Sequence, residues 1–238
     1  MTLTNGALPE THHWQGRPWY LRALRVISLL YMVGAVLGTL FLVAQALIPG
    51  TASPITLPVQ PFWPELPNGV VVTHGPSAEV VGGLTSVAVE VKNLDWNVTA
   101  CLAAGHLVLG AVHFLAAFAA YRISGLFRYP GQSVFQAAIS SIFAVFAWSL
   151  MVGGLAWQVL YSAAGSMAAQ QALTFTGWSV TDGAMTPETI PTSPLGIVPA
   201  TAMEVDLWPI TAGLALMAIV AMLRHGEKLE AATVHGHA

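Results

Sequence analysis

Residues 26–48 read VISLLYMVGAVLGTLFLVAQALI, an apolar run without a single charged side chain. A helix needs roughly 20 apolar residues to cross the hydrocarbon core of a bilayer. Three comparable runs follow at 98–121, 134–162 and 207–223, and the last of them is the shortest. We therefore predict an integral membrane protein with four spans, the first of which covers 22–48.

The composition of the whole chain supports a membrane protein. Of its 238 residues 55% are hydrophobic and only 8% are charged, whereas soluble domains carry about 25% charged residues. Because so few charges cannot cover a water-facing surface, lipid must be the solvent for much of the chain. The net charge of −3 gives no basic field, so we expect no nucleic-acid partner. The single cysteine, Cys101, excludes a disulfide within one chain and a cysteine-rich metal site.

The basic residues fall almost entirely on one side of the predicted spans. Seven of the eight lie before the first span, between the second and third spans, or after the fourth: Arg17, Arg22, Arg25, Arg122, Arg128, Arg224 and Lys228. By the positive-inside rule this side is cytoplasmic. We therefore expect a plasma (inner) membrane protein with both termini in the cytoplasm, and with cytoplasmic segments at 1–21, 122–133 and 224–238.

A competing interpretation makes the first span a secretory signal peptide, with Ala44-Gln45-Ala46 as an A-x-A cleavage site. Signal peptides have apolar regions of about 7–15 residues. The apolar run here is longer, and a mostly polar leader of about 16 residues precedes Arg17, the first arginine of the chain. We favour a retained membrane span.

Two outer segments, 49–97 and 163–206, hold most of the mass outside the predicted spans. Both contain short runs rich in β-branched residues: Ile55–Val59, Val70–Thr73, Val80–Val81, Val87–Val91 and Leu173–Val180. Within one of these runs Val87, Val89 and Val91 alternate with more polar or smaller residues, and a two-residue period is typical of a half-buried strand. We therefore predict a mainly α protein, a four-transmembrane-helix bundle with a small extracytoplasmic β-rich cap made from both outer segments.

Two histidines in the second span, His106 and His113, are candidates for chemistry. They are seven residues apart, so they share one helix face at about 10.5 Å along the axis. Ionisable groups inside a membrane are functional candidates by default, and one hypothesis is a haem- or quinone-binding redox subunit that uses both side chains. The other three spans contain no histidine to complete a bis-histidine haem site, so we favour hydrogen bonding across the bundle and predict no cofactor. The candidate hydrogen-bond partners are Gln45, Gln158, Ser140 and Ser149.

Three carboxylates near the outer ends of spans two and four form a candidate metal site. Asp95, Glu204 and Asp206 could together bind a divalent cation through oxygen ligands. The alternative is that they are solvated boundary residues, and we favour it because no metal-loop spacing is present. Asp206 is also positioned to cap the fourth span.

Small residues recur at four-residue spacing inside the spans. Gly34 and Gly38 form a G-x-x-x-G pattern in the first span, and Ala116 and Ala120 repeat the spacing in the second. This pattern allows two helix backbones to approach closely. It predicts either packing within the bundle or a contact between copies of the chain, and it implies no activity.

Two segments on the basic side resemble a known family. Residues 126–135 read LFRYPGQSVF, an aromatic and basic stretch followed by glycine and phenylalanine, and residues 224–230 read RHGEKLE, a basic-Gly-x-x-Leu-acidic pattern. Together with the four-span plan and the larger first outer segment, they resemble bacterial membrane proteins catalogued as domain of unknown function 2975. The resemblance implies a bacterial plasma-membrane protein of unknown activity, in a family sometimes linked with a small helix-turn-helix regulator. The chain departs from the family at 136–141, which lacks the basic residues common there.

The sequence contains no motif for nucleophilic, phosphoryl-transfer or metallopeptidase chemistry, since G-x-S-x-G, P-loop and H-E-x-x-H patterns are all missing. We therefore predict a non-enzymatic membrane protein that binds a partner or senses a signal through its outer segments. The alternatives are the redox subunit described above and an accessory subunit of a larger membrane complex.

Overall fold

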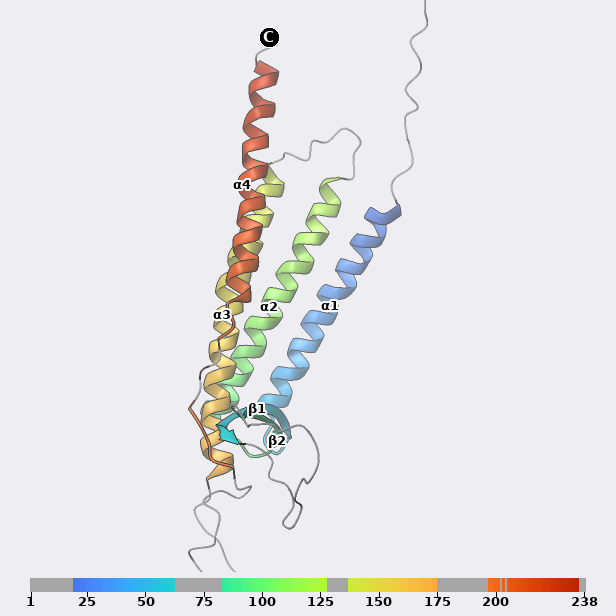
Figure 1. The fold of residues 1–238 in the computed structure, drawn as a ribbon. Helices are drawn as coiled ribbons and strands as arrows, with labels where there is room; N and C mark the ends of the chain where they lie inside the picture. The colour runs from blue at the N-terminus through green and yellow to red at the C-terminus, as the bar shows by residue number, and fades with distance from the viewer. Residues whose placement is uncertain are drawn as a thin grey trace, which may run out of the picture.

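The computed structural model describes residues 19–62, 83–127, 137–174, 197–201, 203 and 205–235. These residues form four helices and one hairpin (Figure 1): α1 (Trp19–Leu47), β1 (Ser53–Phe62), β2 (Leu84–Val91), α2 (Trp96–Leu126), α3 (Ala137–Leu173) and α4 (Trp208–His235). All four helices are long and apolar enough to cross a membrane. The prediction of a mainly helical protein with four candidate spans is confirmed.

The helices pack against one another in chain order. Helix α1 packs on α2, α2 on α3, and α3 on α4, and Figure 1 shows them as a row. Among the described residues α1 makes no comparable contact with α3 or α4, so the predicted bundle takes the form of an open row. The physical reason is that lipid tails solvate apolar side chains as well as a neighbouring helix does. An open row therefore has nearly the same free energy as a compact bundle.

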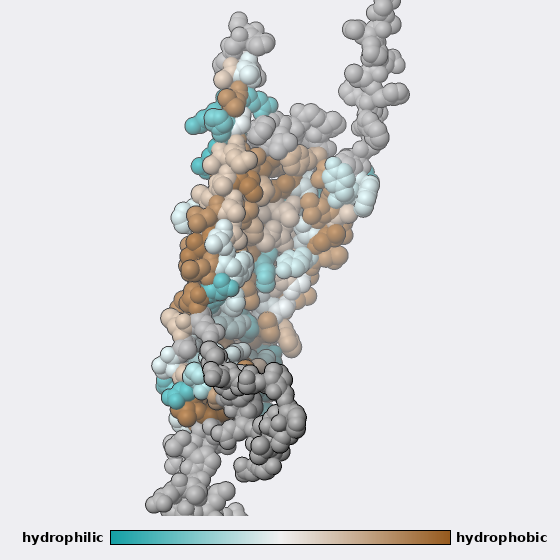
Figure 2. Space-filling view, viewed as in Figure 1, coloured by the Kyte–Doolittle hydropathy of each residue, from teal (hydrophilic) through white to brown (hydrophobic). Residues whose placement is uncertain are grey.

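The outward surface of the helices is apolar, as lipid contact requires. On α1 the side chains of Leu30, Leu37 and Phe41 are 66%, 62% and 67% exposed. Figure 2 shows the hydrophobic colour spread over the helical part of the molecule. In water, such a surface would be an aggregation hazard.

The hairpin lies at the end of the row where α1 and α3 end and where α2 and α4 begin (Figure 1). The beginning of α1 and the end of α4 are therefore both on the opposite side of the molecule, as four antiparallel passes require. Arg25 of α1 lies at that opposite end, where its guanidinium donates to the Tyr121 hydroxyl of α2 at 2.8 Å. The assignment of this end to the cytoplasm rests on the charge distribution alone.

Strands β1 and β2 pair antiparallel, from Ser53 opposite Val91 to Pro58 opposite Ser86. The burial of β2 alternates along the strand, and Val87, Val89 and Val91 form the partly buried face, as predicted. Proline cannot donate to a ladder and is therefore confined to edge strands. Strand β1 is such an edge strand, because β2 is its single sheet partner in the described chain.

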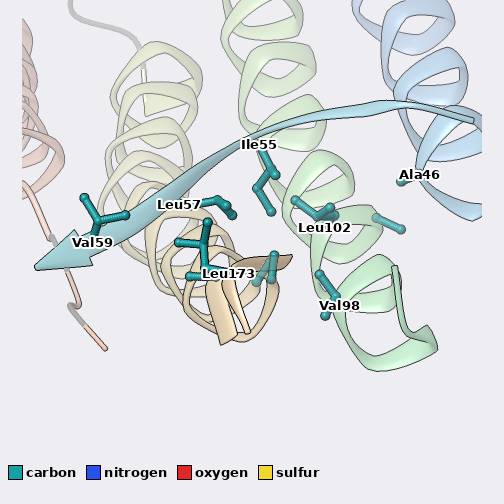
Figure 3. Close-up of a cluster of buried hydrophobic side chains, with 11 residues drawn as sticks. Ala46, Ile55, Leu57, Val59, Val98, Leu102 and Leu173 are labelled. Carbon is teal, nitrogen blue, oxygen red and sulfur yellow. The ribbon is translucent and has the colours of Figure 1, made fainter. Parts of the chain in front are cut away.

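One face of β1 docks on the helices and forms the main apolar core (Figure 3). Ile55, Leu57 and Val59 belong to one buried cluster with Val98 and Leu102 of α2, and Figure 3 shows Ile55 as the strand residue beside Leu102. Helix α3 completes the cluster with four residues: Ala164, Ala168, Ala169 and Leu173. The approach is close enough that a Cβ on Gly165 would lie 2.7 Å from the backbone oxygen of Thr56.

The part of the second outer segment that the structure describes adds one bridge to the cap, and the remainder of the predicted run Leu173–Val180 from residue 175 onward lies outside the described residues. The described part of the sheet is two-stranded, and the segment adds an isolated bridge between Val59 and Pro199. The bridge is flanked by two hydrogen bonds, from Gln60 N to Val198 O at 2.9 Å and from Ala200 N to Pro58 O at 3.1 Å. Two predicted runs, Val70–Thr73 and Val80–Val81, lie outside the described residues.

Helix α3 continues past the predicted end of the third span at residue 162. It reaches Leu173, which we had predicted to begin a strand. The residues from 163 to 173 read AAGSMAAQQAL, and their alanine and glutamine content favours helix. The apolar run therefore predicted the membrane crossing, but the helix itself is eleven residues longer at this end.

Candidate functional site

A pocket of about 800 Å³ lies between the cap, α3 and the segment that leads into α4. Its volume is within the range of small-molecule sites, roughly 300–1,000 Å³. Strand β1 supplies one wall between Pro54 and Pro58. The residues that matter most for its chemistry are Trp157, Gln158, Tyr161, Val205, Asp206 and Trp208.

Helical periodicity explains the wall that α3 supplies. Trp157, Tyr161 and Gly165 are four residues apart, and Gln158 and Ser162 lie beside them with the same spacing. Residues at i and i+4 lie on one face of a helix. The glycine at the end of this row allows β1 to approach, so the pocket is bounded by the docked cap.

Gln158 is the most informative residue in the pocket. Its side chain is only 7% exposed. The side-chain oxygen Oε1 accepts the backbone N–H of Asp206 at 2.6 Å, whereas Nε2 has no hydrogen-bond partner in the described part of the chain. An unsatisfied buried donor costs about 1–3 kcal/mol. Nε2 itself exposes less than 1 Å² of surface, so an acceptor atom of a ligand would bond to it after a small rearrangement of the pocket wall.

His106 and Tyr161 join α2 to α3 at the edge of this pocket. The Tyr161 hydroxyl is hydrogen-bonded to Nδ1 of His106, and the two rings meet edge-on with centroids 5.2 Å apart. Trp157 packs edge-on against the same tyrosine at 5.5 Å. The predicted histidine bond across the helices therefore exists, but with a partner that we did not predict.

The four partners that we proposed for the histidines are engaged elsewhere. Gln45 donates to Ala52 O, Ser140 to Ala137 O and Ser149 to Phe146 O. Gln158 bonds Asp206, as described above. Three of the four side chains thus donate to backbone carbonyls close to them in sequence. These local hydrogen bonds compete with hydrogen bonds between helices, and the spacing of the side chains does not show which of the two will form.

His113 lies apart from His106 and outside the pocket. It is exposed on α2, and its ring meets Tyr31 of α1 edge-on at 6.1 Å. The two histidines therefore face different neighbours, α3 for one and α1 for the other. The haem or quinone hypothesis stays a prediction, and α1 and α3 contain no histidine that could supply a ligand from a facing helix.

The structure does not bring Asp95 and Asp206 together. Asp95 N donates to Oε1 of Gln171 at 3.1 Å, and Asp206 N donates to Gln158. These two glutamines are thirteen residues apart on α3, or about 20 Å along its axis. Glu204, the third predicted ligand, lies outside the described residues, and those that are described contain no group of three or more potential metal ligands.

Asp206 instead caps α4. Its Oδ1 accepts the backbone N–H of Trp208 at 3.0 Å, which satisfies one of the free donors at the start of the helix. The predicted cap is confirmed. Capping leaves the negative charge of Asp206 in the wall of the pocket.

The predicted glycine pair does not pack within the described chain. A Cβ added to Gly34 or Gly38 would meet nothing within 4 Å. The close approach of α1 to α2 lies at Gly110, where an added Cβ would be 1.9 Å from Oγ1 of Thr39. Ala116 and Ala120 are half-buried on the same helix.

Comparison of the chain with protein families, curated proteins and solved structures finds no match. The resemblance to the domain of unknown function 2975 family therefore stays a prediction. The site is interpreted from its own residues.

Proposed function

We propose that this chain is a non-enzymatic plasma-membrane protein that binds a small amphipathic molecule in the pocket beneath its outer cap and senses it. The observation that carries the proposal is the side chain of Gln158. It is nine-tenths buried in the pocket wall, and its Nε2 has no partner among the described residues. A ligand with a hydrogen-bond acceptor would satisfy this donor.

An amphipathic ligand fits the composition of the walls. Pro58, Val205 and Trp157 offer apolar contact, while Gln158 and Asp206 offer polar contact. Tryptophan is enriched at the boundary between a membrane and water. Trp208, which lines the pocket, is the first residue of α4 on the cap side. A molecule that partitions into this boundary would reach the pocket from the bilayer or from the outer solution.

A sensing role is supported by the fact that the pocket walls come from separate parts of the chain. Strand β1, helix α3 and the start of α4 are three separate segments, and a ligand that binds all three favours the conformation in which they are closest. Helix α4 then runs from the pocket to the basic end of the molecule, where Arg224 and Lys228 lie. A shift of α4 would therefore carry the signal to a protein partner on the cytoplasmic side.

The other two functions have less support in the described residues. For a redox subunit, His106 is engaged by Tyr161 and His113 by Tyr31 of another helix. For an accessory subunit, no part of the described surface favours a particular protein partner over lipid. Binding in the pocket is favoured because the described residues leave one specific buried donor without an acceptor there.

Native mass spectrometry of the protein, purified from its own membranes in mild detergent, tests the proposal. We expect a small molecule to remain bound to the wild type. Ser86→Phe should displace it, because Ser86 of β2 lines the pocket. The matched control is Thr85→Phe, at an exposed neighbour whose side chain points to the other face of the strand. A wild type that carries no bound molecule, or a bound mass that Ser86→Phe leaves unchanged, would overturn the proposal.

A further inference from the structure

The walls of the pocket also indicate the charge of its ligand, an inference that rests on the proposed function. We infer that the ligand is a cationic amphiphile, with an amine or quaternary ammonium group and a hydrogen-bond acceptor close to that group. Three independent features of the described residues support this class: the charge in the wall, the aromatic side chains, and the position of the free amide.

The first feature is the electrostatics of the wall. Asp206 is the one charged side chain among the described residues that line the pocket. The single basic residue of the outer segments, Lys92, is not among them. A lone carboxylate attracts a positively charged group and repels an anionic one. Fatty acids and anionic head groups are therefore poor ligands for this pocket.

The second feature is the concentration of aromatic side chains. Trp157, Tyr161 and Trp208 all line the pocket, and Trp208 lies two residues from the carboxylate of Asp206. Aromatic faces attract cations through the ring quadrupole, and tryptophan is the strongest. Aromatic side chains beside a carboxylate form the kind of surface that recognises ammonium groups.

The third feature is the distance between donor and charge. The backbone nitrogen of Asp206 lies 2.6 Å from the side-chain oxygen of Gln158, so the carboxylate and the free Nε2 belong to neighbouring residues of the same wall. A ligand whose acceptor oxygen lies a few bonds from its nitrogen would suit such neighbours. Choline and ethanolamine esters have this arrangement, and the apolar chain would lie against Pro58 and Met203.

The test compares two esters that differ only in charge. Hexanoylcholine carries the cation, and 3,3-dimethylbutyl hexanoate replaces its ammonium nitrogen by carbon. Each is titrated into the full-length protein in dodecyl maltoside micelles, and tryptophan fluorescence reports binding. We expect the wild type to bind the cationic ester about tenfold more tightly, because its ammonium group is attracted by the Asp206 carboxylate and by the neighbouring aromatic faces together.

Two variants assign this preference to the carboxylate. Asp206→Asn keeps an oxygen that can cap α4, and it should reduce the tenfold preference to about twofold or less. Asp95→Asn is the matched control, because its carboxylate lies outside the pocket and makes no capping hydrogen bond. It should keep the full preference, as should the charge-retaining Asp206→Glu.

The outcomes separate this inference from the proposed function. If both esters bind the wild type equally and Ser86→Phe abolishes both, the pocket binds amphiphiles but the cation inference is wrong. If Ser86→Phe binds both esters like the wild type, the pocket is not the site and both proposals fail. An undiminished tenfold preference in Asp206→Asn would also overturn the inference, because the carboxylate would then contribute nothing.

Discussion

Asp206 donates its backbone N–H to the side-chain oxygen of Gln158 at 2.6 Å, and this bond ties the start of α4 to α3. Asp95 makes the equivalent bond to Gln171 at 3.1 Å, ahead of α2. A glutamine of α3 therefore holds the beginning of each of the two helices that start on the cap side. The pocket lies at the first of these junctions, where the glutamine is buried and its amide nitrogen is unpaired.

Substitution of the two glutamines should have unequal effects on stability. Gln158→Ala removes a buried hydrogen bond and leaves a small cavity, so we expect it to lower the free energy of unfolding by about 1–2 kcal/mol. Gln171→Ala removes bonds exposed to solvent, and we expect less than about 0.5 kcal/mol. Reversible unfolding in mixed detergent micelles measures both. Equal losses would show that burial at the junction does not matter.

The hydrogen bond between His106 and Tyr161 should appear as an energetic coupling between α2 and α3. A double-mutant cycle of His106→Ala and Tyr161→Phe should give a coupling of about 0.6 kcal/mol or more, the average for such bonds in a membrane. His113→Ala provides the control, because His113 faces Tyr31. The changes in the free energy of unfolding caused by His113→Ala and by Tyr161→Phe should simply add. Strict additivity in the His106 cycle would contradict the bond.

Two glycines on neighbouring helices should respond in opposite ways to an added methyl group. Gly110→Ala would force a Cβ against Thr39, whose hydroxyl is held to Ala35 O at 2.6 Å. Because the threonine cannot turn aside without losing that bond, we expect a loss of about 1–3 kcal/mol. Gly34→Ala meets open space and should be neutral or slightly stabilising. The same unfolding assay decides, and a large loss for Gly34→Ala would instead indicate a contact between copies of the chain.

The fold was predictable from the sequence where one physical signal dominates. Length and apolarity define the four helices, and the alternation of Val87, Val89 and Val91 defines β2. The end of α3 was missed because helix propensity, unlike apolarity, continues to Leu173. The open row of helices was missed because no pattern within one helix shows which of its faces remain in contact with lipid.

The pocket could not be predicted, because its walls come from parts of the chain with no shared sequence signal. Gln158 appeared only as one of several candidate partners for a histidine. Its importance depends on Asp206, which occupies the amide oxygen and leaves the nitrogen free. Asp206 itself was identified twice, as a cap and as a metal ligand, and the structure supports the cap.

Cysteine accessibility tests the orientation that the charge distribution indicates. In a Cys101→Ser background, a membrane-impermeant maleimide should label Thr85→Cys on β2 in intact spheroplasts. Thr233→Cys, near the end of α4, should react only after permeabilisation. Both residues are exposed, so accessibility reports the side of the membrane. The reverse labelling pattern would place the cap in the cytoplasm and contradict the positive-inside assignment.

An experimental structure of the protein extracted together with its native lipids tests the ligand pocket most directly. The account predicts an elongated, non-protein density in the pocket, with an atom at about 2.7–3.2 Å from Nε2 of Gln158, a normal hydrogen-bond distance. A pocket filled by side chains of the protein itself, with one of them bonded to Nε2, would contradict it.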